Sequence, residues 1–203
     1  MGRRLRNHLL APLRLTVLSD DQCRRCGVTS INEERIEFAR RFVRGRLLDV
    51  GCGRNRLVEG YPQFGIGVDV FDWRAGALIL KDTSRLPFLD RSFDTITILA
   101  ALNHIPNRDA VLTDVRRVLR DNGRVVLTMI TPALSTIGHR VLWWYGEDWA
   151  RGMADGEVFG FTPRQVNALM HDAGFTLERH TRFLYGLNHL YVFRKRRDAD
   201  ERA

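Results

Sequence analysis

A buried-strand pattern that runs into a turn with two glycines is the feature that most constrains the fold. Residues 47–55 read LLDVGCGRN, in which four strand residues lead into a G-x-G turn and then into polar residues. Glycine has no Cβ and tolerates positive φ, so a turn of this kind lets backbone N–H groups approach a ligand closely. We therefore expect a ligand to bind where this strand ends. A G-x-G taken alone is also compatible with an ordinary tight turn.

The residues that follow the turn exclude two common nucleotide-binding loops. A dinucleotide fingerprint continues as G-x-G-x-x-G, but Arg56 stands at its sixth position. A P-loop ends in glycine and lysine followed by serine or threonine, and the turn lacks that ending. The sequence therefore disfavours NAD, FAD and an ATP molecule bound through a P-loop.

A second strand pattern strengthens the ligand-binding interpretation. Residues 65–70 read GIGVDV, which places Asp69 at the end of an apolar strand, twenty residues after Asp49. In a doubly wound sheet, an acid at the tip of the second strand is placed to accept hydrogen bonds from the two hydroxyls of a ribose. Asp82 follows a further short strand over 78–81. The pattern thus indicates a ligand that carries a ribose.

The order of the motifs resembles that of a known enzyme family. DVGCG, VD, D-x-x-x-L-P-F, SFD, NHI and R-V-L-R-x-N-G follow one another over residues 46–131, with weaker continuity to about residue 193. This order resembles the class I S-adenosylmethionine-dependent methyltransferases, and among them the small type 11, ubiquinone-biosynthesis-like group. The resemblance implies an α/β fold with a Rossmann-like, mostly parallel seven-stranded sheet, a reversed last strand and flanking helices. It does not identify the methyl acceptor.

Periodicity along the chain is consistent with such a sheet. Short apolar runs are typical of parallel strands buried on both faces, and they recur near 46–51, 66–70, 78–81, 93–99 and 124–130. Residues 107–120 carry apolar side chains on one helical face. We expect Asn107 to cap this helix and Gly123 to lie at its end or in the next turn.

The last third of the chain is expected to complete the sheet. A helix should run from about 162 to 174, with Pro163 in its first turn. Two strand-like segments follow, at 175–183 and 188–194, and only a short turn separates them. We therefore expect an antiparallel hairpin at this end of the sheet.

The sequence departs from the family pattern at two places. Only about eight residues, 70–77, separate the second strand from the third, whereas a crossover connection takes a dozen or more. We expect this second crossover helix to be shortened or missing, and its face of the sheet to be shielded by residues 31–44, including Phe38 and Phe42. Asn55 replaces a third glycine, and asparagine enters the left-handed conformation readily enough to keep the turn.

The resemblance also assigns roles to individual residues. It implies that S-adenosylmethionine is the cofactor, bound by Asp49, Gly51, Gly53, Asn55, Asp69, Val70, Asp82 and Thr83. Asp49 and the two glycines would line its methionine end, and Asp69 would hold the ribose hydroxyls. Val70 would flank the adenine, whose amino group would donate to Asp82 beside the Thr83 backbone. The alternative for each acid is a helix cap or a solvated loop residue.

His104 and a run of aromatic residues are the candidates for the reaction itself. His104 follows the fourth strand, and a histidine at neutral pH can deprotonate a hydroxyl or an amine. Its alternative role is only to fix the loop and the cofactor's carboxylate. We expect residues 131–161 to form a lid over an apolar or ring-bearing acceptor, contacted by Trp144 and Trp149. Core packing or a dimer contact would also use such aromatic residues.

Length and charge set the expected domain organisation. A chain of 203 residues that is 44% hydrophobic suits one catalytic domain. We place this domain at 46–193, between a basic helical extension at 1–45 and a charged, disordered tail at 194–203. The net charge of +8 lies mainly in the two ends, but thirty of the 32 basic residues are arginine. This indicates a compositional bias more readily than a nucleic-acid-binding patch.

Cysteine usage and hydropathy favour the cytoplasm. The C-x-x-C at 23–26 is solitary and lacks further ligands at zinc spacing, so we expect reduced thiols and no metal site. No apolar run approaches the ~20 residues of a membrane-spanning helix.

The most favoured function is methyl transfer to a small acceptor, expected as O-methylation, with nitrogen and carbon as the less favoured methylated atoms. The alternative enzyme is an RNA methyltransferase that uses the basic N-terminal margin. It would lack the N-P-P-Y/F type of tetrapeptide, in whose place residues 101–104 read ALNH. A third hypothesis is a non-catalytic, cofactor-binding partner protein whose residues 1–18, apolar and rich in arginine, dock on a membrane surface or on another subunit.

Overall fold

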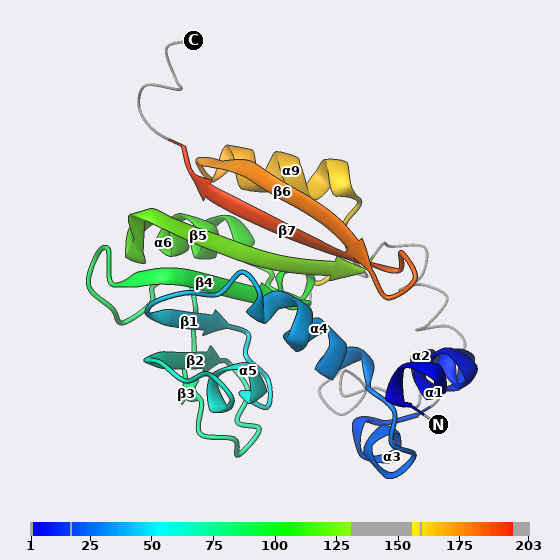
Figure 1. The fold of residues 1–203 in the computed structure, drawn as a ribbon. Helices are drawn as coiled ribbons and strands as arrows, with labels where there is room; N and C mark the ends of the chain where they lie inside the picture. The colour runs from blue at the N-terminus through cyan, green and yellow to red at the C-terminus, as the bar shows by residue number, and fades with distance from the viewer. Residues whose placement is uncertain (1, 17, 131–155, 159, 197–203) are drawn as a thin grey trace.

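The computed structural model describes residues 2–16, 18–130, 156–158 and 160–196 (Figure 1). The N-terminal helices are α1 (Arg3–Leu9), α2 (Ala11–Thr16), α3 (Asp20–Arg25) and α4 (Ile31–Arg40). The next elements are β1 (Leu47–Val50), α5 (Arg56–Glu59), β2 (Gly65–Asp69), β3 (Leu78–Ile79), β4 (Phe93–Leu99) and the 3-10 helix η1 (Leu102–His104). The last are α6 (Arg108–Val118), β5 (Leu119–Ile130), α9 (Pro163–Asp172), β6 (Phe175–Phe183) and β7 (Asn188–Lys195).

Within the described residues the strands form one seven-stranded sheet in the order β3-β2-β1-β4-β5-β7-β6. The first five strands run parallel, whereas β7 is antiparallel to both of its neighbours. β1 lies between β2 and β4, where Leu48 pairs with Ile66 on one side and with Ile96 on the other. The predicted sheet with a reversed last strand is confirmed, and so is the terminal hairpin.

Two apolar clusters cover the two faces of the sheet. In the larger cluster, Val115 of α6 and Met170 of α9 pack against the strands. In the smaller cluster, Ala39 of α4 packs with Val126 of β5. β1 is buried along its whole length, as an apolar strand enclosed on both faces must be. None of the helices that the structure describes has the length and apolar character needed to cross a membrane.

The connection from β2 to β3 contains no helix, which confirms the predicted loss of the second crossover helix. The prediction of what shields the sheet there is wrong. Phe38 stacks on Phe183 of β6 with ring centroids 4.7 Å apart, and Phe42 joins the same cluster, so α4 covers the opposite half of the sheet. Leu78 and Ile79 of β3 are accordingly 42% and 40% exposed.

The helix α6, between β4 and β5, begins and ends at other residues than predicted. α6 stops one residue before Leu119, because Leu119 pairs with Phe93 of β4 and begins β5. Asn107 occupies the N-cap position without making a capping bond, since its side-chain amide donates to Asp82 Oδ1 at 3.1 Å. Gly123 lies inside β5 rather than at the helix end. Contacts with other parts of the fold thus replace the local capping expected from sequence.

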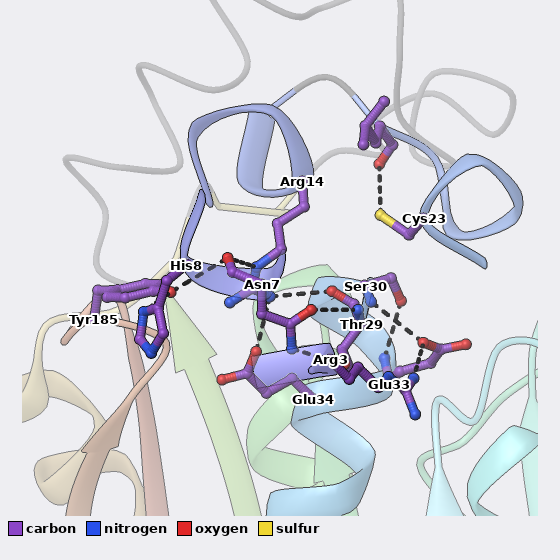
Figure 2. A network of polar contacts seen from close by, with 11 residues as sticks. Arg3, Asn7, His8, Arg14, Cys23, Thr29, Ser30, Glu33, Glu34 and Tyr185 are labelled. Carbon is purple, nitrogen blue, oxygen red and sulfur yellow. Dashed lines mark hydrogen bonds and ion pairs between the residues drawn. The ribbon is translucent and has the colours of Figure 1, made fainter. Parts of the chain in front are cut away.

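The helices α1, α2 and α3 lie on the side of the sheet to which its parallel strands point (Figure 1). A network of polar contacts holds them there (Figure 2). Arg14 of α2 donates to Glu34 of α4 at 2.8 Å and to the Thr29 carbonyl at 3.1 Å. Tyr185, in the turn between β6 and β7, lies with its hydroxyl 2.9 Å from His8 Nδ1 of α1. The Arg14 side chain is 2% exposed, so this cation is fully engaged inside the protein.

Replacing Arg14 should destabilise the fold far more than replacing an exposed arginine of the same region. Arg14→Ala leaves the Thr29 carbonyl and the partly buried Glu34 carboxylate without their donor, at a cost of about 2–4 kcal/mol. Arg24→Ala removes surface ion pairs such as that with Asp21, worth about 1 kcal/mol or less. Urea unfolding of the two variants provides the comparison. Equal losses would contradict a supporting role for the Arg14 network.

Candidate active site

The predicted ligand-binding turn after β1 has the positive φ angles that its glycines allow. Gly51, Gly53 and Asn55 have φ values of 68°, 53° and 55°. A Cβ on Gly51 would lie 2.5 Å from the Cβ of Ala101, so only glycine lets the turn approach the segment after β4. The prediction that Asn55 adopts the left-handed conformation is confirmed.

The side chain of Asn55 holds the loop that follows β2. Its amide donates to the Ala75 carbonyl at 3.3 Å. A Cβ on Gly67 of β2 would lie 2.1 Å from Asn55 Oδ1, so this second glycine makes room for the amide. Asn55 therefore shapes the site through its backbone and through this loop contact.

Asp69 links the turn after β1 to the end of β2. Its Oδ2 accepts a hydrogen bond from the Gly53 N–H at 2.8 Å, and its Oδ1 accepts one from the Phe71 N–H at 3.0 Å. The residue is 8% exposed. Each carboxylate oxygen has two lone-pair sites, so each retains the capacity for a second bond. Asp69 can thus organise the two loops and still accept hydrogen bonds from a ligand.

Asp49 is a buried carboxyl group near the end of β1. Its one hydrogen bond within the described residues comes from the Thr97 hydroxyl of β4, 2.6 Å from Oδ1. Burial raises the pKa of Asp49 to about 7; the bond from Thr97 opposes this effect, and the charge of Asp69 adds to it. No described cation contributes to this balance. A cationic ligand would supply the partner that favours the ionised carboxylate.

The residues expected around an adenine lie beyond the ends of β2 and β3. Val70 is 49% exposed, whereas Thr83 is buried. Asp82 accepts hydrogen bonds from the Ser84 N–H at 2.8 Å, from the Ser84 hydroxyl at 2.6 Å and from the Asn107 amide. These bonds, those from Ser84 above all, lower the pKa of Asp82. Asp82 therefore ties the loop after β3 to the start of α6.

His104 forms a close pair with a buried glutamate. His104 Nδ1 lies 2.9 Å from Glu157 Oε2, and the side chains are 19% and 1% exposed. The segment that carries Glu157 is held against η1, because the Val158 N–H donates to the Asn103 carbonyl at 3.0 Å and the Asn103 amide donates to the Val158 carbonyl at 3.3 Å. A carboxylate beside Nδ1 fixes the orientation of the imidazole and favours Nε2 as the nitrogen that accepts a proton.

Two contributors to the site were not found from the sequence. Thr97 lies in the apolar run 93–99, and a hydroxyl in such a strand is the one indication in the sequence that it has a polar partner. Glu157 lies 53 residues after His104, and nothing in the sequence connects the two. The predicted acceptor residues Trp144 and Trp149 lie outside the described residues.

Solved structures share this fold. The PH0226 protein from Pyrococcus horikoshii superposes with a TM-score of 0.63 at 19% identity, over 91% of this chain and 96% of that chain. The 1,6-didemethyltoxoflavin-N1-methyltransferase from Burkholderia thailandensis, solved with S-adenosylhomocysteine, has a TM-score of 0.57 at 18% identity, over 82% of this chain and 80% of that chain. At these identities the likeness concerns the fold alone.

Curated relatives add a likeness in sequence. A demethylmenaquinone methyltransferase from Thermotoga maritima is 30% identical over 115 residues, which are 49% of this chain and 50% of the relative. The ubiquinone/menaquinone biosynthesis C-methyltransferase UbiE from Desulfotalea psychrophila is 26% identical over 162 residues, 72% of this chain and 63% of the relative. The chain thus spans between half and two thirds of the length of these relatives.

The model of the methyltransferase domain family matches most of the chain. It matches residues 27–180, a range that contains α4, the five parallel strands, the turn after β1 and His104. The seven-stranded order of the sheet and its reversed last strand agree with that match. This chain therefore belongs to the methyltransferase domain family, within the class I S-adenosylmethionine-dependent methyltransferases.

Proposed function

We propose that this protein methylates a ring-bearing acceptor at a carbon next to a hydroxyl group, with S-adenosylmethionine as the methyl donor. The observation that carries the proposal is the His104–Glu157 pair beside the ligand-binding turn. The His104 N–H donates to the Ala101 carbonyl at 2.9 Å, and Ala101 is the residue against which Gly51 packs. A base and a cofactor site are therefore neighbours at one edge of the sheet.

The described residues fit the cofactor. Asp49 offers a buried carboxylate to the ammonium group of its methionine part, and Asp69 keeps lone pairs for the ribose hydroxyls. Apart from the two neighbours of Gly53 in the chain, none of the residues that the structure describes has an atom within 4 Å of the place where Gly53 would carry a Cβ. Among these residues the turn therefore adjoins open space. We assign to this site Asp49, Gly51, Gly53, Asn55, Asp69, Val70, Asp82 and Thr83.

The proposed chemistry starts with a proton. S-adenosylmethionine, when bound, supplies a methyl group attached to a sulfonium ion. The rest of the cofactor is the leaving group, because its sulfur becomes a neutral thioether. His104, oriented by Glu157, takes the proton of the acceptor's hydroxyl group. The electron pair of the phenolate is shared between its oxygen and the adjacent ring carbon, so either atom can attack the methyl group. Attack through carbon is completed when that carbon releases its own proton to solvent, the ring becomes aromatic again, and His104 returns the first proton to the oxygen.

The names of the curated relatives favour carbon over oxygen as the methylated atom. UbiE from Desulfotalea psychrophila is named a C-methyltransferase, and the Thermotoga maritima relative is named for demethylmenaquinone. We therefore replace the O-methylation expected from sequence with C-methylation in this proposal. Trp144 and Trp149 remain the proposed contacts of an apolar acceptor.

The other two hypotheses find less support. A nucleic-acid-binding margin needs exposed, unpaired cations, but arginines of the N-terminal region pair with acids of the same region, as in Arg3–Glu33, Arg14–Glu34 and Arg24–Asp21. The comparisons match methyltransferases, which does not favour a non-catalytic partner protein. Membrane or subunit contact through residues 1–18 stays a prediction.

Transfer of a ¹³C-labelled methyl group tests the function directly. The protein is incubated with labelled S-adenosylmethionine and a naphthohydroquinone that lacks its ring methyl group. We expect a product whose labelled carbon couples to a ring carbon in its NMR spectrum. A methoxy product would contradict carbon attack. Labelling of RNA alone, in a cell extract separated into RNA, lipid and small-molecule fractions, would contradict the small-molecule acceptor.

Cofactor binding should depend on the ionisation of Asp49. Because an ammonium group favours the carboxylate, a protonated Asp49 must lose its proton on binding. The affinity should therefore rise by up to about tenfold per pH unit as the pH approaches about 7, and level off above it. Calorimetry with S-adenosylhomocysteine between pH 5.5 and 8.5 measures this slope. Asp49→Asn is the matched control, expected to bind more weakly and without the slope; the same slope in both proteins would exclude Asp49 as its source.

His104 and Glu157 should affect turnover rather than cofactor binding. His104→Ala is expected to lower kcat by ~10²–10⁴, the usual contribution of a general base, with the affinity for S-adenosylhomocysteine close to that of the unaltered protein. Glu157→Gln removes the carboxylate that orients the imidazole, so kcat should fall by a smaller factor. His171→Ala, in an exposed position of α9, is the control. A loss of cofactor affinity that matches the loss of turnover would assign His104 a structural role instead.

A further inference from the structure

A cavity of about 250 Å³ lies away from the active site, on the face of the sheet that α4 covers. Its lining residues come from the chain after α4 and from β5, β6 and β7: Phe42, Arg124, Glu178, Arg179 and Val192. Arg124 pairs with Thr95 near the start of β4, whereas the ligand-binding turn follows the far end of β1. The two sites are therefore at opposite ends of the parallel strands.

A β-bulge in β6 brings two consecutive side chains to this cavity. The register with β7 shifts between Leu177 and Arg179, which leaves Glu178 as the extra residue. Consecutive residues of a regular strand point to opposite faces, but a bulge re-aims one of them. Glu178 and Arg179 consequently line the same cavity.

The charges around the cavity are mostly positive. Glu178 is already engaged, because Arg194 donates to both of its carboxylate oxygens, at 2.7 and 2.5 Å. Arg124 and Arg194 stand directly opposite each other on β5 and β7, and like charges in that arrangement destabilise a sheet. Burial, and then the charge of Arg44, lower the pKa of Arg124. The cluster thus holds more cations than its one acid can neutralise.

The guanidinium of Arg124 has unmet hydrogen-bonding capacity. Its Nε is buried, and no described residue accepts a hydrogen bond from it. The guanidinium of Arg179 lies 5.6 Å from the centre of the Phe42 ring, at the same cavity. The guanidinium groups of Arg124 and Arg179 have the planar donor geometry that suits phosphate oxygens, and the Phe42 ring and Val192 offer an apolar surface beside them.

We propose that this cavity binds a small phosphate-bearing molecule, whose phosphate is held by Arg124 and Arg179 and whose organic part lies against Phe42 and Val192. A phosphate suits the site better than a carboxylate because it carries more negative charge and more acceptor oxygens. The flat face of Phe42 favours an organic part that contains a ring. The inference is independent of the methyl acceptor and of the roles of Asp49 and His104.

Titration of the full chain with phenyl phosphate tests the site. Binding is followed by NMR on the arginine Nε–H resonances, with the Arg124 signal assigned through Arg124→Gln. We expect this signal to shift to a saturable end point, with weaker binding of inorganic phosphate and of benzoate. Arg124→Gln should weaken phenyl phosphate binding by at least about tenfold, as the loss of charge-assisted bonds implies. Arg25→Gln, the same charge change at an exposed position of α3, should stay within about twofold.

Two further variants keep the test decisive. Arg179→Gln alters an exposed residue of the edge strand, so it reports on the site even if Arg124→Gln does not fold. Phe42→Leu should reduce the preference for phenyl phosphate over inorganic phosphate. Shifts that never saturate, or equal weakening by Arg25→Gln and Arg179→Gln, would show general attraction of anions to a basic protein and overturn the proposal. Tighter binding of benzoate than of phenyl phosphate would overturn the phosphate assignment.

Discussion

The carboxylate of Asp69 makes the connection on which the proposed cofactor site of this fold depends. It accepts hydrogen bonds from the Gly53 N–H in the turn after β1 and from the Phe71 N–H in the loop after β2. Two backbone segments with little regular structure are thereby fixed to one side chain at the tip of a buried strand. The turn is pressed against Ala101 on its other side, where only a glycine at position 51 fits. Both constraints act within one small region, so the geometry of β1, β2 and β4 sets the positions of the proposed binding residues.

The parts of the fold that follow from local sequence were predictable. The turn after β1 needs positive φ at three positions, and the residues there are two glycines and Asn55, which tolerate it. The missing crossover helix follows from counting the residues between β2 and β3. α9 begins with Thr162 as its cap and Pro163 in its first turn, and both act within a few residues of the chain.

The features that depend on distant parts of the chain were not predictable in the same way. Asn107 was expected to cap α6, but Asp82 competes for its side chain, and only the tertiary structure brings the two together. The partners His104 and Glu157 are 53 residues apart, and no periodicity links them. The shielding role predicted for Phe38 is wrong. Hydrophobicity predicts that a side chain is buried, but it does not predict which half of a sheet covers that side chain. The cationic cavity likewise depends on the bulge at Glu178, which the sequence of β6 does not indicate.

The contact between Tyr185 and His8 joins positions 177 residues apart, and this separation has a consequence for folding. Closing so long a loop costs conformational entropy, so such a contact forms after the nearer ones. The helix that carries His8 precedes the turn that carries Tyr185 in the chain, with all seven strands but the last between them. At this corner of the molecule α1 therefore completes its packing only when the hairpin of β6 and β7 is in place. Arg14 finds Glu34 and the Thr29 carbonyl nearby in the chain, so the contact that closes last at this corner is the one between α1 and the hairpin.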